Sequence, residues 1–164
     1  MTRMAPISLV ALMLSLAPAW AGSLSDDADF VTRASTGNLF AITESRLALE
    51  RSQDPRVKAL AHRLAEDHEG AETALQAAAD GSGITLATAL DPNHQARVTA
   101  LQSKSGADFD KAYIADQGAL HSNALTLYGD CMLLSDNKKL KTLAIKMIPV
   151  TATQLNDIRA LSGN

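Results

Sequence analysis

The sequence is poor in several residue types, and each shortage excludes a class of protein. Aromatic residues make up only 4% of the 164 residues, which disfavours a sheet rich in Tyr and Phe. Cys131 is the only cysteine, so an internal disulfide framework and a cysteine-rich zinc site are both excluded. Basic residues are not in excess: 15 Lys and Arg against 18 Asp and Glu give a formal net charge of −3. Nucleic-acid-binding proteins normally carry a basic excess, so no nucleic-acid partner is expected.

Long hydrophobic runs are also scarce, and the one that exists lies at the N-terminus. Residues 7–16 form an apolar run preceded by Arg3 and followed by Pro18 and the small-residue stretch 19–22. This layout is typical of a secretory signal peptide with a cut after Ala21. A membrane anchor is the alternative, but a bilayer span needs roughly 20 apolar residues.

These features predict a signal peptide over residues 1–21 and a single helical bundle domain over residues 22–164. Loss of Arg3 with the signal peptide would change the net charge from −3 to −4. No transmembrane segment is expected in the mature chain, because no other apolar stretch approaches spanning length. The expected location is the periplasm or the outer membrane, where the protein would be peripheral.

The remaining chain is rich in Ala and Leu, and this composition predicts helices rather than strands. Asp54-Pro55 and Asp91-Pro92 each combine an N-cap residue with a proline in the first helical turn. With the turn signals around them, helices are expected over about 26–51, 55–79, 92–104, 108–134 and 136–162. The fold class predicted is all-α: a four-helix bundle with one short extra helix. Pro149 lies inside the last helix and should kink it.

Five polar residues fall on the apolar faces of these helices, when positions are counted at 100° per residue. They come from five different segments: Glu44, His68, His94, His121 and Gln154. Buried polar groups need partners, so they either satisfy one another or hold a transition metal ion, for which imidazole and carboxylate are usual ligands. The candidate metal ligands are His68, His94, His121 and Glu44. Acceptors for the second nitrogen of each histidine would come from Asp67, Glu72 or Asp91.

Sequence motifs for catalysis are absent, which favours a non-enzymatic protein and leaves the question of an enzyme open. The chain has no Gly-x-Ser-x-Gly, phosphate loop or His-Glu-x-x-His, and no Glu-x-x-His of the kind found in di-iron bundles. Cys131 falls on an apolar face, where a thiol usually serves as packing. Four lysines cluster near the start of the last helix, either as a solvated face or as a contact for anionic lipid or polymer: Lys138, Lys139, Lys141 and Lys146.

Several short fragments occur in an order and spacing that match a known pattern. They are residues 30–31 (FV), 38–40 (NLF), 45–49 (SRLAL), 54–58 (DPRVK), 63–68 (RLAEDH), 90–94 (LDxxH), 106–113 (GAxFDxxY), 117–121 (QxxxH) and Pro149. Over about residues 29–161 the chain therefore resembles the domain-of-unknown-function 4142 family. The resemblance implies a ferritin-like helical bundle in an exported bacterial protein, often described as an outer membrane protein. It implies no established reaction.

The chain departs from this family at two inward positions. Ala41 stands where the family usually has Glu, and Gln154 stands where it often has His. Two hypotheses therefore stay open. In the first, inward histidines bind a transition metal in envelope stress or metal handling. In the second, the protein is a non-enzymatic envelope component that binds a partner protein, and its buried histidines are structural.

Overall fold

The computed structural model describes residues 26–163, and within that range every regular element is a helix. There are five: α1 (Asp27–Arg51), α2 (Pro55–Ala79), α3 (Pro92–Gln102), α4 (Gly106–Leu134) and α5 (Lys138–Leu161). The predicted all-α class is confirmed. The predicted signal peptide and the cut after Ala21 lie outside the described residues. Between residues 26 and 163, no helix is both long and apolar enough to cross a membrane.

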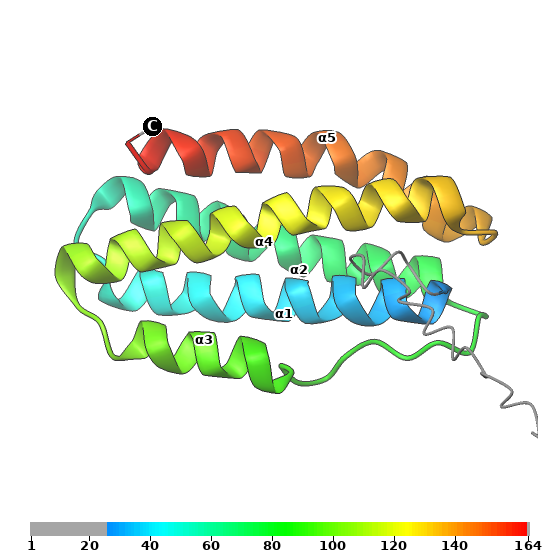
Figure 1. The fold of residues 1–164 in the computed structure, drawn as a ribbon, viewed down its shortest axis with the longest axis horizontal. Coiled ribbons are helices and arrows are strands. Elements are labelled where there is room, and N and C mark those ends of the chain that lie inside the picture. The colour runs from blue at the N-terminus through cyan, green and yellow to red at the C-terminus, as the bar shows by residue number, and fades with distance from the viewer. Residues whose placement is uncertain (1–25, 164) are drawn as a thin grey trace, which may run out of the picture.

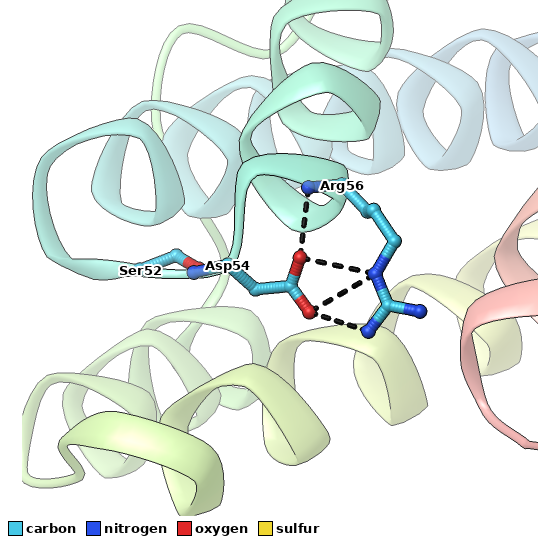
Figure 2. A network of polar contacts seen from close by, with 3 residues as sticks. All are labelled: Ser52, Asp54 and Arg56. Carbon is cyan, nitrogen blue, oxygen red and sulfur yellow. Dashed lines mark hydrogen bonds and ion pairs between the residues drawn. The ribbon is translucent and has the colours of Figure 1, made fainter.

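Local chemistry sets the helix starts. The side chain of Asp54 accepts a hydrogen bond of 2.8 Å from the Arg56 backbone N–H, and Pro55 occupies the first turn. Figure 2 shows that the same carboxylate also binds the Arg56 guanidinium, with its Nη2 at 2.6 Å. These bonds lower the pKa of Asp54 to about 2, so the cap is ionised at neutral pH. Asp91 caps α3 through the His94 N–H in the same way.

Two predicted helix starts are displaced by two residues. Helix α4 begins at Gly106 rather than Asp108, after the N-cap Ser105. Helix α5 begins at Lys138 rather than Asp136, because Asn137 is the N-cap and accepts from the N–H groups of Lys139 and Leu140. The competing cap therefore decides where α5 starts.

The long helices α1, α2, α4 and α5 pack side by side as a ring (Figure 1). Helix α1 packs against α2 and α4, and α5 packs against α4 and α2, with each packed pair antiparallel. The chain returns from the end of α2 to the start of α4 through residues 80–91 and α3, which lies outside on α1 and α4. Within this ring α2 and α4 face each other diagonally.

The predicted buried face of α2 is confirmed. Its apolar residues are almost fully buried, whereas His62 is exposed: the buried set is Val57, Leu60, Ala61, Leu64, Ala71, Leu75 and Ala78. Small residues on α1 let the neighbouring helix approach, and a Cβ added at Gly37 would lie 3.4 Å from the Leu120 side chain. Cys131 is fully buried in the apolar cluster that contains Phe30 and Leu140. Burial raises the pKa of its thiol to about 11, which favours inert packing.

Candidate functional site

His68 and His121 meet in the middle of the bundle. His68 comes from α2 and His121 from α4, and their Nε2 atoms are 3.4 Å apart. The rings meet edge to face at 81°. His121 is 1% exposed and His68 is partly buried. Two predicted ligands from diagonally opposed helices are thus brought together at one point.

The hydrogen bonds around this pair fix the tautomer of each ring. Asn38 Nδ2 donates to a carboxylate oxygen of Glu72 at 2.8 Å, so Asn38 must turn its carbonyl oxygen toward His68. His68 Nδ1 lies 2.9 Å from that oxygen and therefore donates to it. His121 Nδ1 donates likewise to the Gln117 backbone carbonyl at 2.8 Å. With both Nδ1 atoms protonated, the two neutral rings point the lone pairs of their Nε2 atoms at each other.

Electrostatics keep both rings neutral. Burial, with a further contribution from His121, lowers the pKa of His68 to about 3. Burial also lowers the pKa of His121, although hydrogen bonds to the Gln117 backbone and the Gln154 side chain oppose the shift. Two neutral imidazoles with converging lone pairs are the form in which histidine binds metal ions.

A chain of hydrogen bonds runs from Nδ1 of His68 through Asn38 to Glu72. Beyond Asn38, Glu72 accepts a 2.5 Å bond from the Ser35 hydroxyl. The Ser35 oxygen in turn accepts from the Ala87 N–H at 3.0 Å, in the link between α2 and α3. Glu72 was predicted as an acceptor, and it acts on His68 through Asn38 rather than directly. This chain holds the ring orientation from three segments of the protein.

A surface cavity lies between α2 and α5, and neither histidine of the pair lines it. Its volume is about 260 Å³, and its lining includes Asp67, Gln154 and the partners of an ion pair, Arg63 and Asp157. Gln154 Nε2 donates to Asp67 at 2.9 Å, and Gln154 also contacts His121. Gln154 therefore lies between the cavity and the histidines.

Glu44, the predicted carboxylate ligand, occupies a neighbouring layer of the core. It is fully buried and accepts a 2.9 Å bond from Gln117 Nε2. Its Oε1 and the Oε1 of Gln117 have no hydrogen-bond partner among the described residues. Burial, followed by the nearby charge of Asp116, raises the pKa of Glu44 to about 8. Glu44 is therefore a neutral carboxylic acid at pH 7, joined to the histidine pair through Gln117.

His94, the remaining predicted ligand, lies apart from the pair. Its Nδ1 is 2.7 Å from Asp91 Oδ2, and its ring packs edge-on against Phe40 with centroids 4.8 Å apart. The cap that starts α3 holds His94 in the first turn of that outer helix. Within residues 26–163, no three His, Cys, Asp or Glu side chains are grouped closely enough to hold a metal ion.

Two residues that organise the site were not identified from the sequence. Asn38 is 3% exposed and Gln117 is fully buried, yet each entered the sequence analysis only as part of a family-like fragment. Asn38 follows the buried Ala34 by one helical turn, and that spacing marks it as an inward polar residue.

Comparisons with known proteins point to one family and one fold. The sequence profile of the "Domain of unknown function (DUF4142)" family matches residues 14–161. Curated protein sequences show no significant match. A structure described as "CopM in the Cu(II)-bound form" superposes with a TM-score of 0.70 at 16% identity, covering 85% of this chain and 97% of that one. A DUF305 fragment from Deinococcus radiodurans gives a TM-score of 0.72 at 16% identity, covering 83% and 94%. At such identities these likenesses concern the fold alone.

Proposed function

We propose that this protein, which belongs to the DUF4142 family, binds a transition metal ion between His68 and His121. The observation that carries the proposal is the pair of Nε2 lone pairs facing each other at 3.4 Å. Without a cation between them, two such lone pairs repel. A metal ion between the two Nε2 atoms would remove this repulsion. Each Nδ1 already has the hydrogen-bond acceptor that orients a ligand histidine.

The distance between the two nitrogens fits a metal ion. Imidazole nitrogens lie about 2.0–2.1 Å from zinc, so two of them at a tetrahedral angle are about 3.3 Å apart. The observed separation is 3.4 Å. Imidazole suits Zn, Cu, Fe and Ni. The fold neighbour CopM has been solved in Cu(II)-, Cu(I)- and Ag-bound forms, which makes copper and silver the first ions to test.

In this proposal the other two predicted ligands have different roles. Glu44 is a neutral acid that accepts from the side-chain amide of Gln117, while the backbone carbonyl of Gln117 accepts from His121 Nδ1. His94 is engaged by Asp91 at the start of α3. The ion enters through the cavity between α2 and α5, where Asp67 offers a carboxylate and Gln154 separates it from the pair.

The setting we propose is an exported protein, in the periplasm or associated with the outer membrane, with a signal peptide cut after Ala21. The apolar run with its small-residue cleavage stretch supports this. We also propose that residues 22–164 form one ferritin-like four-helix bundle. The antiparallel ring of long helices and the single long crossover between α2 and α4 support that assignment. The role that follows is metal handling in the cell envelope.

A second candidate is a non-enzymatic envelope protein that uses its surface to bind a partner protein. In it, His68 and His121 serve only to hold the core together. One observation favours it: both rings already satisfy one nitrogen each within the protein, and no third ligand is grouped with them in the described part of the chain.

Thermal melts with Cu²⁺, Zn²⁺ or Ag⁺ in a non-chelating buffer separate the two candidates. An ion at 100 times its Kd should stabilise the folded state by about 2.7 kcal/mol, because only the folded state assembles the pair. His68→Ala and His121→Ala should abolish this increase in Tm. His62→Ala is the matched control, since His62 is exposed on the same helix and pairs only with Glu66.

Equilibrium dialysis of each variant gives a second measure that does not depend on its stability. One ion bound per wild-type chain, and none in either core variant, is the expected result. A wild-type melt that no ion shifts, or a shift that His62→Ala removes, would favour the structural role instead.

A further inference from the structure

The most exposed large apolar side chains belong to one helical hairpin, formed by α4 and α5. The large hydrophobic residues most exposed in the described chain are Leu133 at 71%, Leu134 at 57%, Ile145 at 52% and Val150 at 42%. All four lie at the end of α4 or on α5. A single exposed apolar residue is ordinary, but a group on one hairpin marks an interaction surface.

The first half of α5 carries an excess of positive charge, since residues 138–150 contain four lysines and no Asp or Glu. Lys138, Lys139, Lys141 and Lys146 are four of the seven lysines in the chain, whose overall net charge is −3. Among residues 26–163 none of the four forms an ion pair with a carboxylate. Lys139 donates only to the backbone carbonyl of Asp80, at 3.2 Å. This positive charge is therefore available to an external anion.

Helical spacing places both kinds of side chain on one face of α5. Lys138, Ile145 and Pro149 are separated by seven and four residues, so they line up along the helix. Lys139, Lys146 and Val150 form the adjacent line with the same spacing, and all six are exposed. We call these six residues the α5 face. Leu133 and Leu134, at the end of α4, are exposed shortly before it in the chain.

The start of α5 is an unusual place for this charge. The first turn of a helix carries a partial positive charge, which favours acidic residues. The first turn of α5 holds no acidic residue and begins with Lys138 and Lys139. An external anionic surface at this point would offset the repulsion between the lysines and the helix dipole.

We infer that the α5 face docks on the surface of an anionic lipid bilayer. The lysines contact lipid phosphates, and the apolar residues Ile145 and Val150 enter the boundary between head groups and acyl chains. Interfacial protein segments combine these two features. The inference does not rest on the metal site, although Val150 also lines the cavity beside Gln154.

Charge argues against a second copy of the chain as the occupant. A symmetric dimer through the α5 face would place lysine against lysine, since the same patch would lie on both sides. A lipid surface carries the complementary charge and accepts the apolar side chains at the same time.

The test is sedimentation of the full chain with vesicles, comparing variants that share the same N-terminal segment. On phosphatidylglycerol vesicles, Lys138→Gln/Lys146→Gln should weaken partitioning by roughly 25-fold, about fivefold for each lysine. The matched control is Lys104→Gln/Lys111→Gln, which removes the same charge outside the α5 face and should leave partitioning within twofold. Ile145→Ser/Val150→Ser should weaken it by at least tenfold.

Three outcomes would overturn the inference. The first is equal partitioning of the face and control variants on phosphatidylglycerol. The second is an effect of the lysine substitutions that is the same on uncharged phosphatidylcholine vesicles. The third is a dimer in light scattering that Ile145→Ser/Val150→Ser converts to monomer, because a second copy would then occupy the face.

Discussion

Two adjacent layers of the bundle respond to burial in opposite ways. The histidine layer consists of His68, His121 and Asn38, and the glutamate layer consists of Glu44 and Gln117. Burial favours the uncharged form in both. An uncharged imidazole is a metal ligand, whereas an uncharged carboxylic acid is a poor one. The same physical environment therefore leaves neutral imidazoles in one layer and a neutral carboxylic acid in the other, and only the first suits the proposed cation site.

Hydrogen bonding separates the layers further. In the histidine layer each Nδ1 has an acceptor, and the two Nε2 atoms lie 3.4 Å apart, with the Gln154 side chain against His121. In the glutamate layer two oxygens, Oε1 of Glu44 and of Gln117, lack a partner among the residues described. A proton on Glu44 reduces the cost of that arrangement, because it removes a buried charge.

The largest expected effect comes from Glu44→Gln. The folded pKa of about 8 exceeds the ordinary 4.5, so the stabilisation linked to this group is complete below pH 4.5 and is lost as the pH rises toward 8. Glutamine keeps the shape without titrating. Relative to wild type, Glu44→Gln should therefore gain about 3 kcal/mol between pH 5 and 7.5, as measured by urea unfolding. A difference that is constant with pH would show that Glu44 is ionised in the folded protein.

A smaller effect of opposite direction is expected at His68. Its folded pKa of about 3 lies below the ordinary 6.5, so its stabilisation is complete above pH 6.5 and is lost as the pH falls toward 3. Because His68 is only partly buried, we expect a loss of roughly 2 kcal/mol between pH 6.5 and 4.5 that His68→Gln removes. His62→Gln, on the exposed side of α2, should leave the pH profile unchanged. If both variants flatten the profile equally, the histidine layer is not the source.

The smallest effect concerns a hydrogen bond beside the glutamate layer. Tyr113 and Ser45 are both fully buried, and their hydroxyl oxygens are 2.9 Å apart. Tyr113→Phe leaves the Ser45 hydroxyl without this partner and should destabilise the fold by about 1–2 kcal/mol in chemical denaturation. Tyr128→Phe on the same helix removes a hydroxyl with no hydrogen bond among the described residues and should cost less. The metal-dependent rise in Tm should survive in both variants; its loss in Tyr113→Phe would mean that the two layers are coupled.

Helices and their starts were largely predictable, because their signals are local. Two helices start with an N-cap residue followed directly by proline, at Asp54-Pro55 and Asp91-Pro92. Both helices begin as expected. The start of α5 was misplaced because Asp136 and Asn137 compete as caps. The turn before α5 is also held by a hydrogen bond from the Ser135 hydroxyl to Asp27. Such a contact, between residues far apart in sequence, leaves no local signal.

Helical periodicity identified the inward residues but not their neighbours. His68, His94 and His121 each lie on the inner face of their own helix, and only two of them meet. The spacing of residues shows on which side of its own helix a side chain lies. Contact between two side chains depends on how the helix axes are arranged in space. His94 sits on a short helix outside the ring, so its inner face meets Phe40 on α1 instead of the centre. Asn38 and Gln117 gain their roles from the same arrangement.

The long crossover between α2 and α4 has a consequence for the order of assembly. It divides the chain into two hairpins of local contacts, α1 with α2 and α4 with α5, that are separated by residues 80–105. Contacts close in sequence form early in folding, whereas the meeting of His68 with His121 requires the two hairpins to dock. An ion held by both would therefore slow separation of the hairpins more than it would speed their docking, and its effect would be kinetic resistance to unfolding.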